Sequence, residues 1–455
     1  MKRYGFFTVA LALFLGACNP SPKTENAGLQ TVDQQMADWS NDAVMYEVNV
    51  RQYTPEGTFN AFAGHLPRLK ELGVEILWFM PIHPIGEKNR KGTLGSYYSI
   101  KDYKAVNPEF GTLDDFKTLV DKAHEMGFKV LIDCVANHSA WDNVWMENHK
   151  NWYTQDSLGN VVPPVADWSD VADLNYNNPE MRAAMLDAMK FWVSEAGIDG
   201  YRCDYAGGVP TGFWEEARLA LDSIKPVFML AEDQDNIELL NKAFHCNYSW
   251  TMHHYMNEIY KGEKSVPDIK SYFEQIDSTY PEGSYALQFT SNHDENSWNG
   301  TVYERLGDAV KTFAVLSFTV PGMPLIYSGQ EVGLNKRLEF FEKDEIDWTH
   351  DLTMTEFYQK LIDLKQENPA LWNGEAGGRI EFPEDTDHKN LLAFKREKDS
   401  NTVVVVMNLS GETVSGTVSP GNQSFTEYFS GSEIQVSGDL VVELKPWDYR
   451  VYIKN

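Results

Sequence analysis

From residue 43 onward, short apolar runs alternate with longer segments whose apolar residues recur at helical spacing. Glycines follow several of the helical segments, at Gly73, Gly127 and Gly197. The apolar runs lie at 43–50, 74–82, 127–138, 197–206, 225–233, 285–294 and 322–331. Such alternation predicts βαβ units and a parallel sheet.

Polar side chains gather at the C-terminal ends of these runs. They are Asn137, His138, Arg202, Asp204, Glu232, His293 and Asp294. An eight-stranded (β/α)8 barrel, or TIM barrel, builds its active site from such strand ends. Asp204 and Glu232 lie 28 residues apart, which fits one βα unit of roughly 30 residues. Glu232 and Asp294 lie 62 residues apart, which fits two such units. An open doubly wound sheet is the alternative, but no Gly-rich phosphate loop follows the first run.

Two departures from the alternation predict further domains. Asn137 and Asp204 lie 67 residues apart, which is too far for one βα unit. The additional residues are rich in Trp and Asp and predict an inserted subdomain over residues 139–172. From residue 375 the chain changes to short Val- and Thr-rich runs separated by Gly, Asn and Ser. We therefore expect an α/β barrel over 41–138 and 173–374, followed by an antiparallel β-sandwich over 375–455.

The first residues are typical of an export signal. Lys2 and Arg3 precede an apolar stretch of 14 residues, which is too short to span a bilayer and fits a signal peptide over residues 1–17. The stretch ends in LGAC, which resembles a bacterial lipobox and implies that Cys18 carries a lipid. An ordinary signal peptide is the alternative. Residues 18–40 are polar and predict a tether, so we expect an exported protein attached to a bacterial membrane by its lipid.

Composition narrows the choice of ligand. The chain has 39 basic and 67 acidic residues, a net charge of −28, which argues against nucleic acid as a partner. Aromatic residues make up 13% and suit neutral ligands that stack on rings. Besides Cys18 the chain contains Cys134, Cys203 and Cys246. Cys134 and Cys203 lie in strand-like runs without metal-ligand spacing, and we expect these two to be buried thiols rather than part of a disulfide framework.

The acids at the strand ends indicate a chemistry. Asp204, Glu232 and Asp294 would point into one cleft from strands four, five and seven of a barrel. Retaining cleavage of a glycosidic bond needs one ionised carboxylate as nucleophile and one protonated carboxyl as general acid. A single strand-end acid is usually a helix cap or an ion-pair partner, but three at these spacings favour glycoside chemistry.

Four segments carry a specific resemblance: DCVANH (133–138), GYRCDYA (200–206), LAED (230–233) and FTSNHD (289–294). They resemble, in order, the signature segments of the α-amylase family, family 13 of the glycoside hydrolases, and VADLN (171–175) resembles its additional segment. The resemblance spans residues 43 to about 370. It implies a retaining hydrolase that cleaves α-1,4-linked glucans or maltooligosaccharides through a covalent glycosyl-enzyme intermediate.

The resemblance also assigns roles. It implies that Asp204 is the nucleophile, Glu232 the general acid/base, and Asp294 the acid that orients sugar hydroxyls. Arg202 is two residues from Asp204 on the same strand face, where its charge would keep Asp204 ionised. By the same resemblance, His138 and His293 bind the sugar at the cleavage site.

An aromatic platform is expected under the sugar ring. GSYYSIKDY (95–103) resembles the family segment after the second strand and implies that Tyr98 is the platform, with Tyr97 as the competing assignment. Five tryptophans are further candidates, although core packing is the usual role of any one: Trp141, Trp145, Trp152, Trp168 and Trp298. Glu295 has no family counterpart, and we expect a solvated loop acid.

The chain departs from the family after the nucleophile. Gly207 and Gly208 stand where many α-amylases have a Lys-His pair that serves the leaving-group side and calcium. Asn137 and Asp173 match family calcium ligands and offer hard oxygen donors, so calcium is the one cofactor considered, and no organic cofactor is expected. Two alternatives stay open: a transglycosylase or short-oligosaccharide α-glucosidase on the same site, and a non-catalytic carbohydrate-binding protein.

Overall fold

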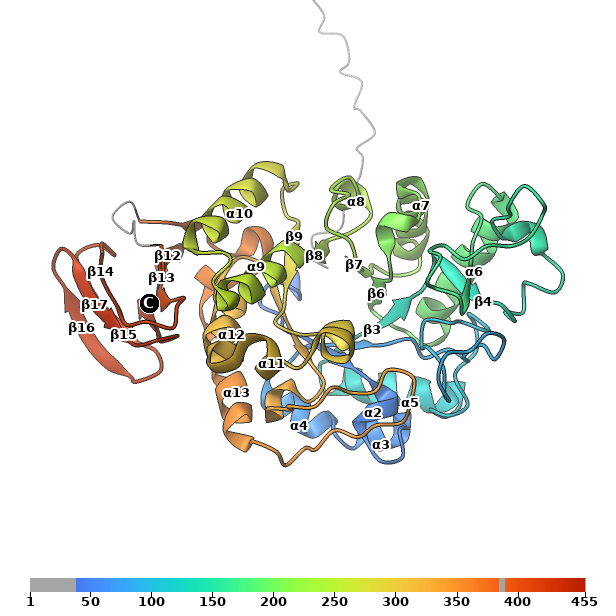
Figure 1. The fold of residues 1–455 in the computed structure, drawn as a ribbon, viewed down its shortest axis with the longest axis horizontal. Coiled ribbons are helices and arrows are strands. Elements are labelled where there is room, and N and C mark those ends of the chain that lie inside the picture. Colours follow the sequence, from blue (N-terminus) through green and yellow to red (C-terminus); the bar gives the residue numbers. More distant parts are fainter. Residues whose placement is uncertain (1–37, 384–388, 455) are drawn as a thin grey trace, which may run out of the picture. The chain divides into compact units, whose positions relative to one another are not determined.

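The computed structural model describes residues 38–383 and 389–454, which lie within one compact unit (Figure 1). The predicted signal peptide, Cys18 and most of the predicted tether lie outside the described residues. None of the helices in the described ranges is long and apolar enough to cross a membrane.

Eight parallel strands close into a barrel, as predicted. Its order around the ring is β1-β10-β9-β8-β7-β6-β3-β2. The strands are Met45–Val48 (β1), Ile76–Phe79 (β2), Lys129–Cys134 (β3), Gly200–Cys203 (β6), Phe228–Ala231 (β7), Cys246–Tyr248 (β8), Tyr285–Gln288 (β9) and Met323–Tyr327 (β10). Because the ring is closed, the doubly wound alternative is wrong.

One strand, β8, lies outside the predicted runs. It is three residues long and carries the polar Asn247 at its centre, so it gives no apolar run. Asn247 is nevertheless buried, and its side-chain oxygen accepts a hydrogen bond from the Tyr280 hydroxyl at 2.8 Å.

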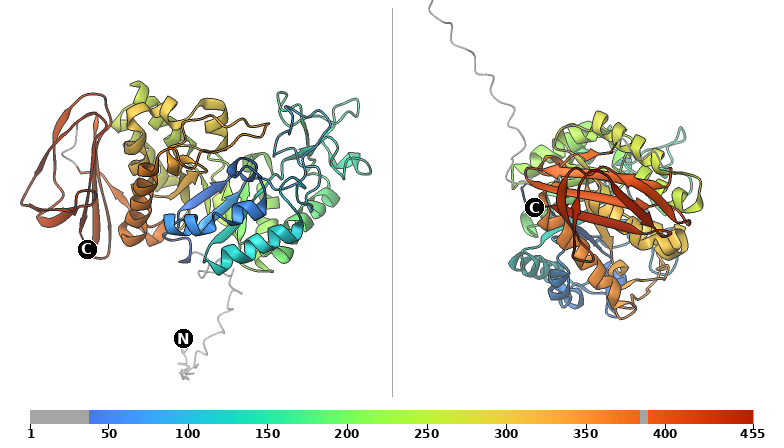
Figure 2. Two further views of the ribbon diagram at one scale, coloured as in Figure 1. Left: turned by 90° about the horizontal axis from the view of Figure 1, so that it is seen from below. Right: turned by 90° about the vertical axis from the view of Figure 1, so that its left-hand side faces the viewer.

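Helices follow the strands and cover the outside of the barrel (Figures 1 and 2). The three predicted helix-stop glycines, Gly73, Gly127 and Gly197, all have positive φ angles (97°, 87° and 69°), which fits the preference of glycine for this conformation after a helix. The α-helices are Val50–Tyr53 (α2), Phe59–Ala63 (α3), Leu66–Leu72 (α4), Leu113–Glu125 (α5), Pro179–Glu195 (α6), Thr211–Asp222 (α7), Leu239–Lys242 (α8), Trp250–Lys261 (α9), Val266–Thr279 (α10), Val302–Leu306 (α11), Val310–Thr319 (α12) and Leu352–Glu367 (α13). The short helices are Lys150–Trp152 (η1), Ala206–Gly208 (η2), the π-helix Glu295–Asn299 (η3), Gly307–Ala309 (η4), Gln330–Val332 (η5), Pro369–Leu371 (η6) and Gly374–Ala376 (η7).

The predicted insertion after the third barrel strand is present. Two short antiparallel strands, His138–Ala140 (β4) and Val171–Asp173 (β5), pair at its base, with His138 opposite Asp173. Between them the chain contains η1 and otherwise turns and loops.

The C-terminal region consists of antiparallel sheets. A six-stranded sheet has the order β11-β12-β13-β18-β15-β16, and β14 pairs with β17. The apolar side chains of the two sheets form one core, which includes Val404, Phe425 and Leu444. The strands are Ile380–Glu381 (β11), Leu391–Lys398 (β12), Asn401–Asn408 (β13), Val414–Val418 (β14), Gln423–Glu427 (β15), Ser432–Val436 (β16), Leu440–Leu444 (β17) and Tyr449–Lys454 (β18).

Arg396 on β12 fastens these sheets to the barrel. Its buried guanidinium donates hydrogen bonds to the carbonyl oxygens of Thr319 and Val320, at the end of α12, and of Leu371. Cys134 and Cys203 are buried and free, as predicted, and so is Cys246.

Candidate active site

A cavity of about 800 Å³ lies at the C-terminal ends of the barrel strands. Asp204, Glu232 and Asp294 all line it. Asp204 directly follows β6, Glu232 directly follows β7, and Asp294 lies six residues after β9. The structure therefore brings the three predicted carboxylates together.

Arg202 on β6 joins two of these carboxylates. Its side chain is fully buried, with Nη1 3.0 Å from Asp204 Oδ1 and Nη2 2.7 Å from Glu232 Oε1. The guanidinium therefore contacts both acids through different nitrogens, so their carboxyl groups are close neighbours. The strand alternation predicted that Arg202 and Asp204 share a face, but the sequence did not predict the contact with Glu232.

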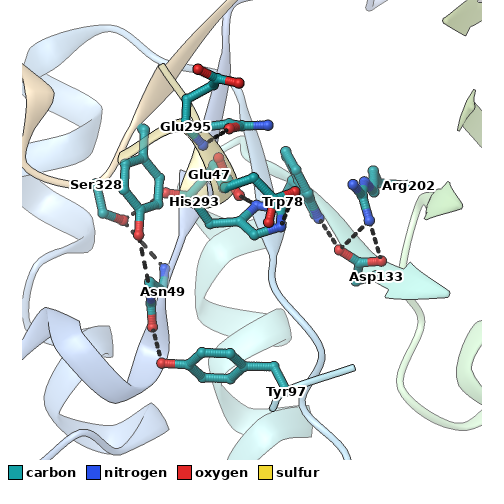
Figure 3. A network of polar contacts seen from close by, with 12 residues as sticks. Glu47, Asn49, Trp78, Tyr97, Asp133, Arg202, His293, Glu295 and Ser328 are labelled. Carbon is teal, nitrogen blue, oxygen red and sulfur yellow. Dashed lines mark hydrogen bonds and ion pairs between the residues drawn. The ribbon is translucent and has the colours of Figure 1, made fainter. Parts of the chain in front are cut away.

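Sequence reasoning missed a further acid, Asp133 on β3. Its buried carboxylate accepts hydrogen bonds from Arg202 Nη1 at 3.0 Å and from Trp78 Nε1 at 3.3 Å (Figure 3). It also accepts one from the Tyr98 hydroxyl at 3.1 Å. The sequence did contain a signal for Asp133, which lies at the centre of an apolar run. An acid buried in such a run needs charged or hydrogen-bonding partners.

Glu47 on β1 was missed for the same reason. Its carboxylate lies 2.5 Å from His293 Nδ1, while His293 Nε2 lies 3.3 Å from Asp294 Oδ2 (Figure 3). Burial alone would lower the pKa of His293, but Asp294 and Glu47 raise it well above its usual value. The imidazole is therefore a buried cation between two carboxylates, and it connects Asp294 to the first strand of the barrel.

The other predicted sugar-binding residues also line the cavity. His138 Nε2 lies 4.0 Å from Asp204 Oδ2, and burial lowers the pKa of His138 to about 4, so the ring is neutral at pH 7. Tyr98 stacks on His293 with ring centroids 5.3 Å apart. Tyr97, the competing assignment, instead donates its hydroxyl to Asn49 and does not line the cavity.

The five candidate tryptophans divide into two groups. Trp168 and Trp298 line the cavity. Trp141, Trp145 and Trp152 pack against the hydrophobic core, and Trp145 and Trp152 contact each other with centroids 5.5 Å apart.

The expectation of a solvated Glu295 is wrong. Its side chain is buried, with Oε2 3.1 Å from His253 Nε2 and 3.9 Å from Arg305 Nη1. Glu295 is the first residue of the π-helix η3, which also carries Trp298. Buried polar contacts therefore anchor the segment on which Asp294 and Trp298 reach the cavity.

In the loop after Asp204, neighbouring side chains fill the space where many α-amylases carry larger residues. A Cβ atom on Gly207 would lie 2.1 Å from Asp233 Oδ2, and one on Gly208 would lie 2.5 Å from Asn137 Oδ1. The two glycines thus permit side chains of neighbouring segments to occupy this space.

The two predicted calcium ligands supply a small donor set. Calcium takes six to eight oxygen ligands, whereas Asn137 and Asp173 are two side chains, and Asn137 Oδ1 faces Gly208. Within residues 38–383 and 389–454, no group of three or more His, Cys, Asp and Glu side chains could hold a metal ion. A calcium ion here would depend on main-chain carbonyls and water for most of its ligands.

The environments of the two central acids separate their pKa values. Burial raises the pKa of Glu232 to about 8, against the opposing charge of Arg202 and with the help of Asp204 and Asp294. Burial raises the pKa of Asp204 to about 6, and here too Arg202 opposes the rise. At pH 7 the pair therefore supplies one ionised carboxylate and one protonated carboxyl, which suits a nucleophile and a general acid.

Comparison with known families agrees with this geometry. The model of the alpha amylase catalytic domain matches residues 28–160 and 165–379. The chain belongs to the α-amylase family. The model of the maltogenic amylase C-terminal domain matches residues 381–451. The predicted family and its glycoside hydrolase domain are therefore confirmed.

Two curated relatives and two solved structures extend the comparison. The chain is 27% identical to the alpha-amylase MalA of Haloarcula japonica over 88% of its own length and 60% of that protein. It is 28% identical to a cyclomaltodextrinase of a Bacillus species, over 86% of this chain and 77% of that one. An alpha-amylase from Lactobacillus plantarum superposes with a TM-score of 0.82 at 30% identity, covering 93% of this chain and all of the other. A noncanonic maltogenic alpha-amylase, AmyB from Thermotoga neapolitana, superposes with a TM-score of 0.83 at 29% identity, covering 90% of this chain and 98% of the other.

The pKa order predicts a bell-shaped dependence of kcat/KM on pH. Activity should rise as the pH passes about 6, because Asp204 must lose its proton, and fall above about 8, because Glu232 must keep its own. Initial rates on a maltooligosaccharide between pH 4 and 10 test this. A glycosyl fluoride is the control, since its leaving group needs no proton; a basic limb that persists with the fluoride would contradict the assignment to Glu232.

Proposed function

We propose that this protein is a retaining hydrolase of α-1,4-linked glucans or maltooligosaccharides. The observation that carries the proposal is the pair Asp204 and Glu232, held on one buried guanidinium, with pKa values about 6 and about 8 on either side of neutrality. The similarity to α-amylases and a cyclomaltodextrinase supports the choice of α-glucan.

The reaction then has two steps. Glu232 donates its proton to the glycosidic oxygen while Asp204 attacks the anomeric carbon, which gives a covalent glycosyl-enzyme and a free leaving sugar with a new non-reducing end; the new reducing end appears when the intermediate is hydrolysed. Glu232, now ionised, takes a proton from water as that water attacks the intermediate, and Asp204 leaves as a carboxylate. The product keeps the α configuration.

The remaining residues bind and orient the sugar. Asp294, ionised because His293 and Arg202 outweigh its burial and lower its pKa, accepts hydrogen bonds from ring hydroxyls. His138 and His293 contact the same sugar, and Tyr98 lies under it as an aromatic platform.

Transglycosylation is the second candidate, because an acceptor hydroxyl can replace water on the same intermediate. An alpha-1,4-glucan:maltose-1-phosphate maltosyltransferase of Salinibacter ruber, 26% identical over 79% of this chain, supports keeping it. The non-catalytic alternative is disfavoured, since Asp204, Glu232 and Asp294 all line the cavity.

Replacement of the nucleophile provides the test. Asp204→Asn should lower kcat on soluble starch by at least about 1,000-fold, because the amide cannot form the glycosyl ester. The matched control is Asp187→Asn on the exposed face of α6, whose side chain is 68% exposed, and circular dichroism should show both variants folded.

Analysis of the wild-type products distinguishes the alternatives. NMR should first detect the α-anomer with a net gain of reducing ends. Longer products without such a gain would mean transfer, and binding of maltooligosaccharide without turnover would support the non-catalytic alternative. Substantial activity of Asp204→Asn would contradict the proposal.

We also propose that the protein is exported and attached to a bacterial membrane through a lipid on Cys18. The support is the sequence alone: a basic start, an apolar stretch and the LGAC ending. Cys18→Ala should move the protein from the membrane fraction to the soluble fraction of the producing bacterium. A variant altered at Ser21 is the control, and continued membrane association of Cys18→Ala would contradict the anchor.

Calcium binding at Asn137 and Asp173 is a separate proposal, supported by their oxygen donors. Dialysis against a calcium chelator should then lower the melting temperature, and calcium, but not magnesium, should restore it, because a bound ion stabilises the folded state. Asp173→Ala should abolish the calcium effect. A melting temperature that is unchanged by the chelator would refute this site.

A further inference from the structure

The proposed reaction determines which part of the cavity binds each end of the glucan chain. Glu232 must face the glycosidic oxygen, so the leaving group lies on its side of the cavity, near Tyr205 and Gln234. The sugar that is attacked lies over Tyr98, beside His293 and Asp294. In an α-1,4-glucan this sugar is on the side toward the non-reducing end, and the rest of that side of the chain must extend past Trp298, Phe340 and Phe341.

Two barrel loops meet on that side. The loop 86–95, which follows β2, and the loop 337–343, which follows β10, are joined by the Leu94 amide donating to the Phe341 carbonyl at 3.0 Å and by the Thr93 amide donating to Glu342 Oε1 at 2.8 Å. Their backbones approach closely, since a Cβ atom on Gly92 (φ 64°) would lie 2.3 Å from Phe341 Cβ. The two loops therefore form a continuous wall.

The loop 86–95 also reaches the inserted segment after the third barrel strand. Lys91 Nζ lies 2.9 Å from Asp170 Oδ1 and donates to the Asp167 carbonyl at 2.9 Å. Asp170 is buried, and both Lys91 and Asp170 line the cavity. Three segments that are distant in sequence thus meet at the lining of the cavity.

Aromatic rings cover the inner face of this wall. Phe340 lies parallel to Tyr98 with centroids 6.3 Å apart, and Trp298 lies 5.2 Å from Phe340 and 5.6 Å from Phe341. Rings suit the apolar faces of sugars, while the Lys91 ammonium offers hydrogen-bond donors to terminal hydroxyls. The wall therefore presents both rings and hydrogen-bond donors that suit a sugar.

We infer that the cavity is closed on its non-reducing side and that the enzyme binds glucan chains by their non-reducing ends, releasing a short product of fixed length. The inference rests on the proposed function. An internal stretch of a glucan would have to pass through the wall formed by loops 86–95 and 337–343 and the Lys91–Asp170 ion pair, whereas a chain end fits against it.

A pair of labelled substrates tests the closure on the wild-type protein. Maltoheptaose labelled at its reducing end is compared with the same compound blocked by a 4,6-O-substituent on the terminal glucose. The wild type should release one short unlabelled product from the open substrate and cleave the blocked one at least about 100-fold more slowly, because the wall excludes the added group.

Opening the wall should relieve this exclusion. The double variant Lys91→Ala/Phe341→Ala removes the ion pair to Asp170 and the ring beside Gly92. We expect the rate of cleavage of the open substrate, divided by that of the blocked one, to fall below about 10. The products should also vary more in length. Lys88→Ala is the matched control, since Lys88 is on the same loop but lies 5.9 Å from the Trp141 ring and does not line the cavity.

The outcomes are separable. Equal wild-type rates on the two substrates would overturn the closure. A wild-type difference that a folded double variant retains would overturn the assignment to this wall. Cleavage of neither substrate would instead refute the proposed function. If the double variant does not fold, the wild-type rate ratio and product length still test whether the cavity is closed on its non-reducing side.

Discussion

The buried guanidinium of Arg202 is the interaction on which the active site depends. It is fully buried and contacts Asp133, Asp204 and Glu232, which come from three adjacent barrel strands. Burying three acids without a counter-charge would be prohibitively unfavourable. Burial raises the pKa values of all three acids, and Arg202 opposes the rise in each; that of Glu232 is raised furthest, to about 8. The proton that acid catalysis requires is therefore held on Glu232 by burial, while the charge of Arg202 limits how far the other two pKa values rise.

A second charged group closes the opposite side of the ring. His293, between Glu47 and Asp294, links the segment after β9 to β1, the first strand of the barrel. The Tyr98 hydroxyl contacts both His293 Nε2, at 2.8 Å, and Asp133. The two clusters are thus one hydrogen-bonded network that crosses the barrel, and the platform tyrosine is part of it. The same contacts therefore tie the first strand of the barrel to the active site.

Much of this could be predicted from the sequence. The barrel, the insertion, the C-terminal sheets and the convergence of Asp204, Glu232 and Asp294 follow from run spacing and recognisable segments. These features are local: a strand-end acid is visible in the run that carries it.

The missed features depend on contacts between distant segments. Glu47 and Asp133 are single acids inside apolar runs, and their partners His293 and Arg202 lie 246 and 69 residues away. Glu295 has the sequence context of a loop acid until α9 places His253 beside it. Strand β8 has too few apolar residues for its period to be recognised. In each case tertiary packing, which no local pattern encodes, determines the outcome.

The two glycines after Asp204 limit how the leaving-group side can change. The side-chain ends of Asp233 and Asn137 occupy the space beside Gly207 and Gly208, so a larger residue there would have to displace them. Asp233 itself lines the cavity. A substitution at Gly207 would therefore also alter the polar surface that the cavity presents to a leaving sugar.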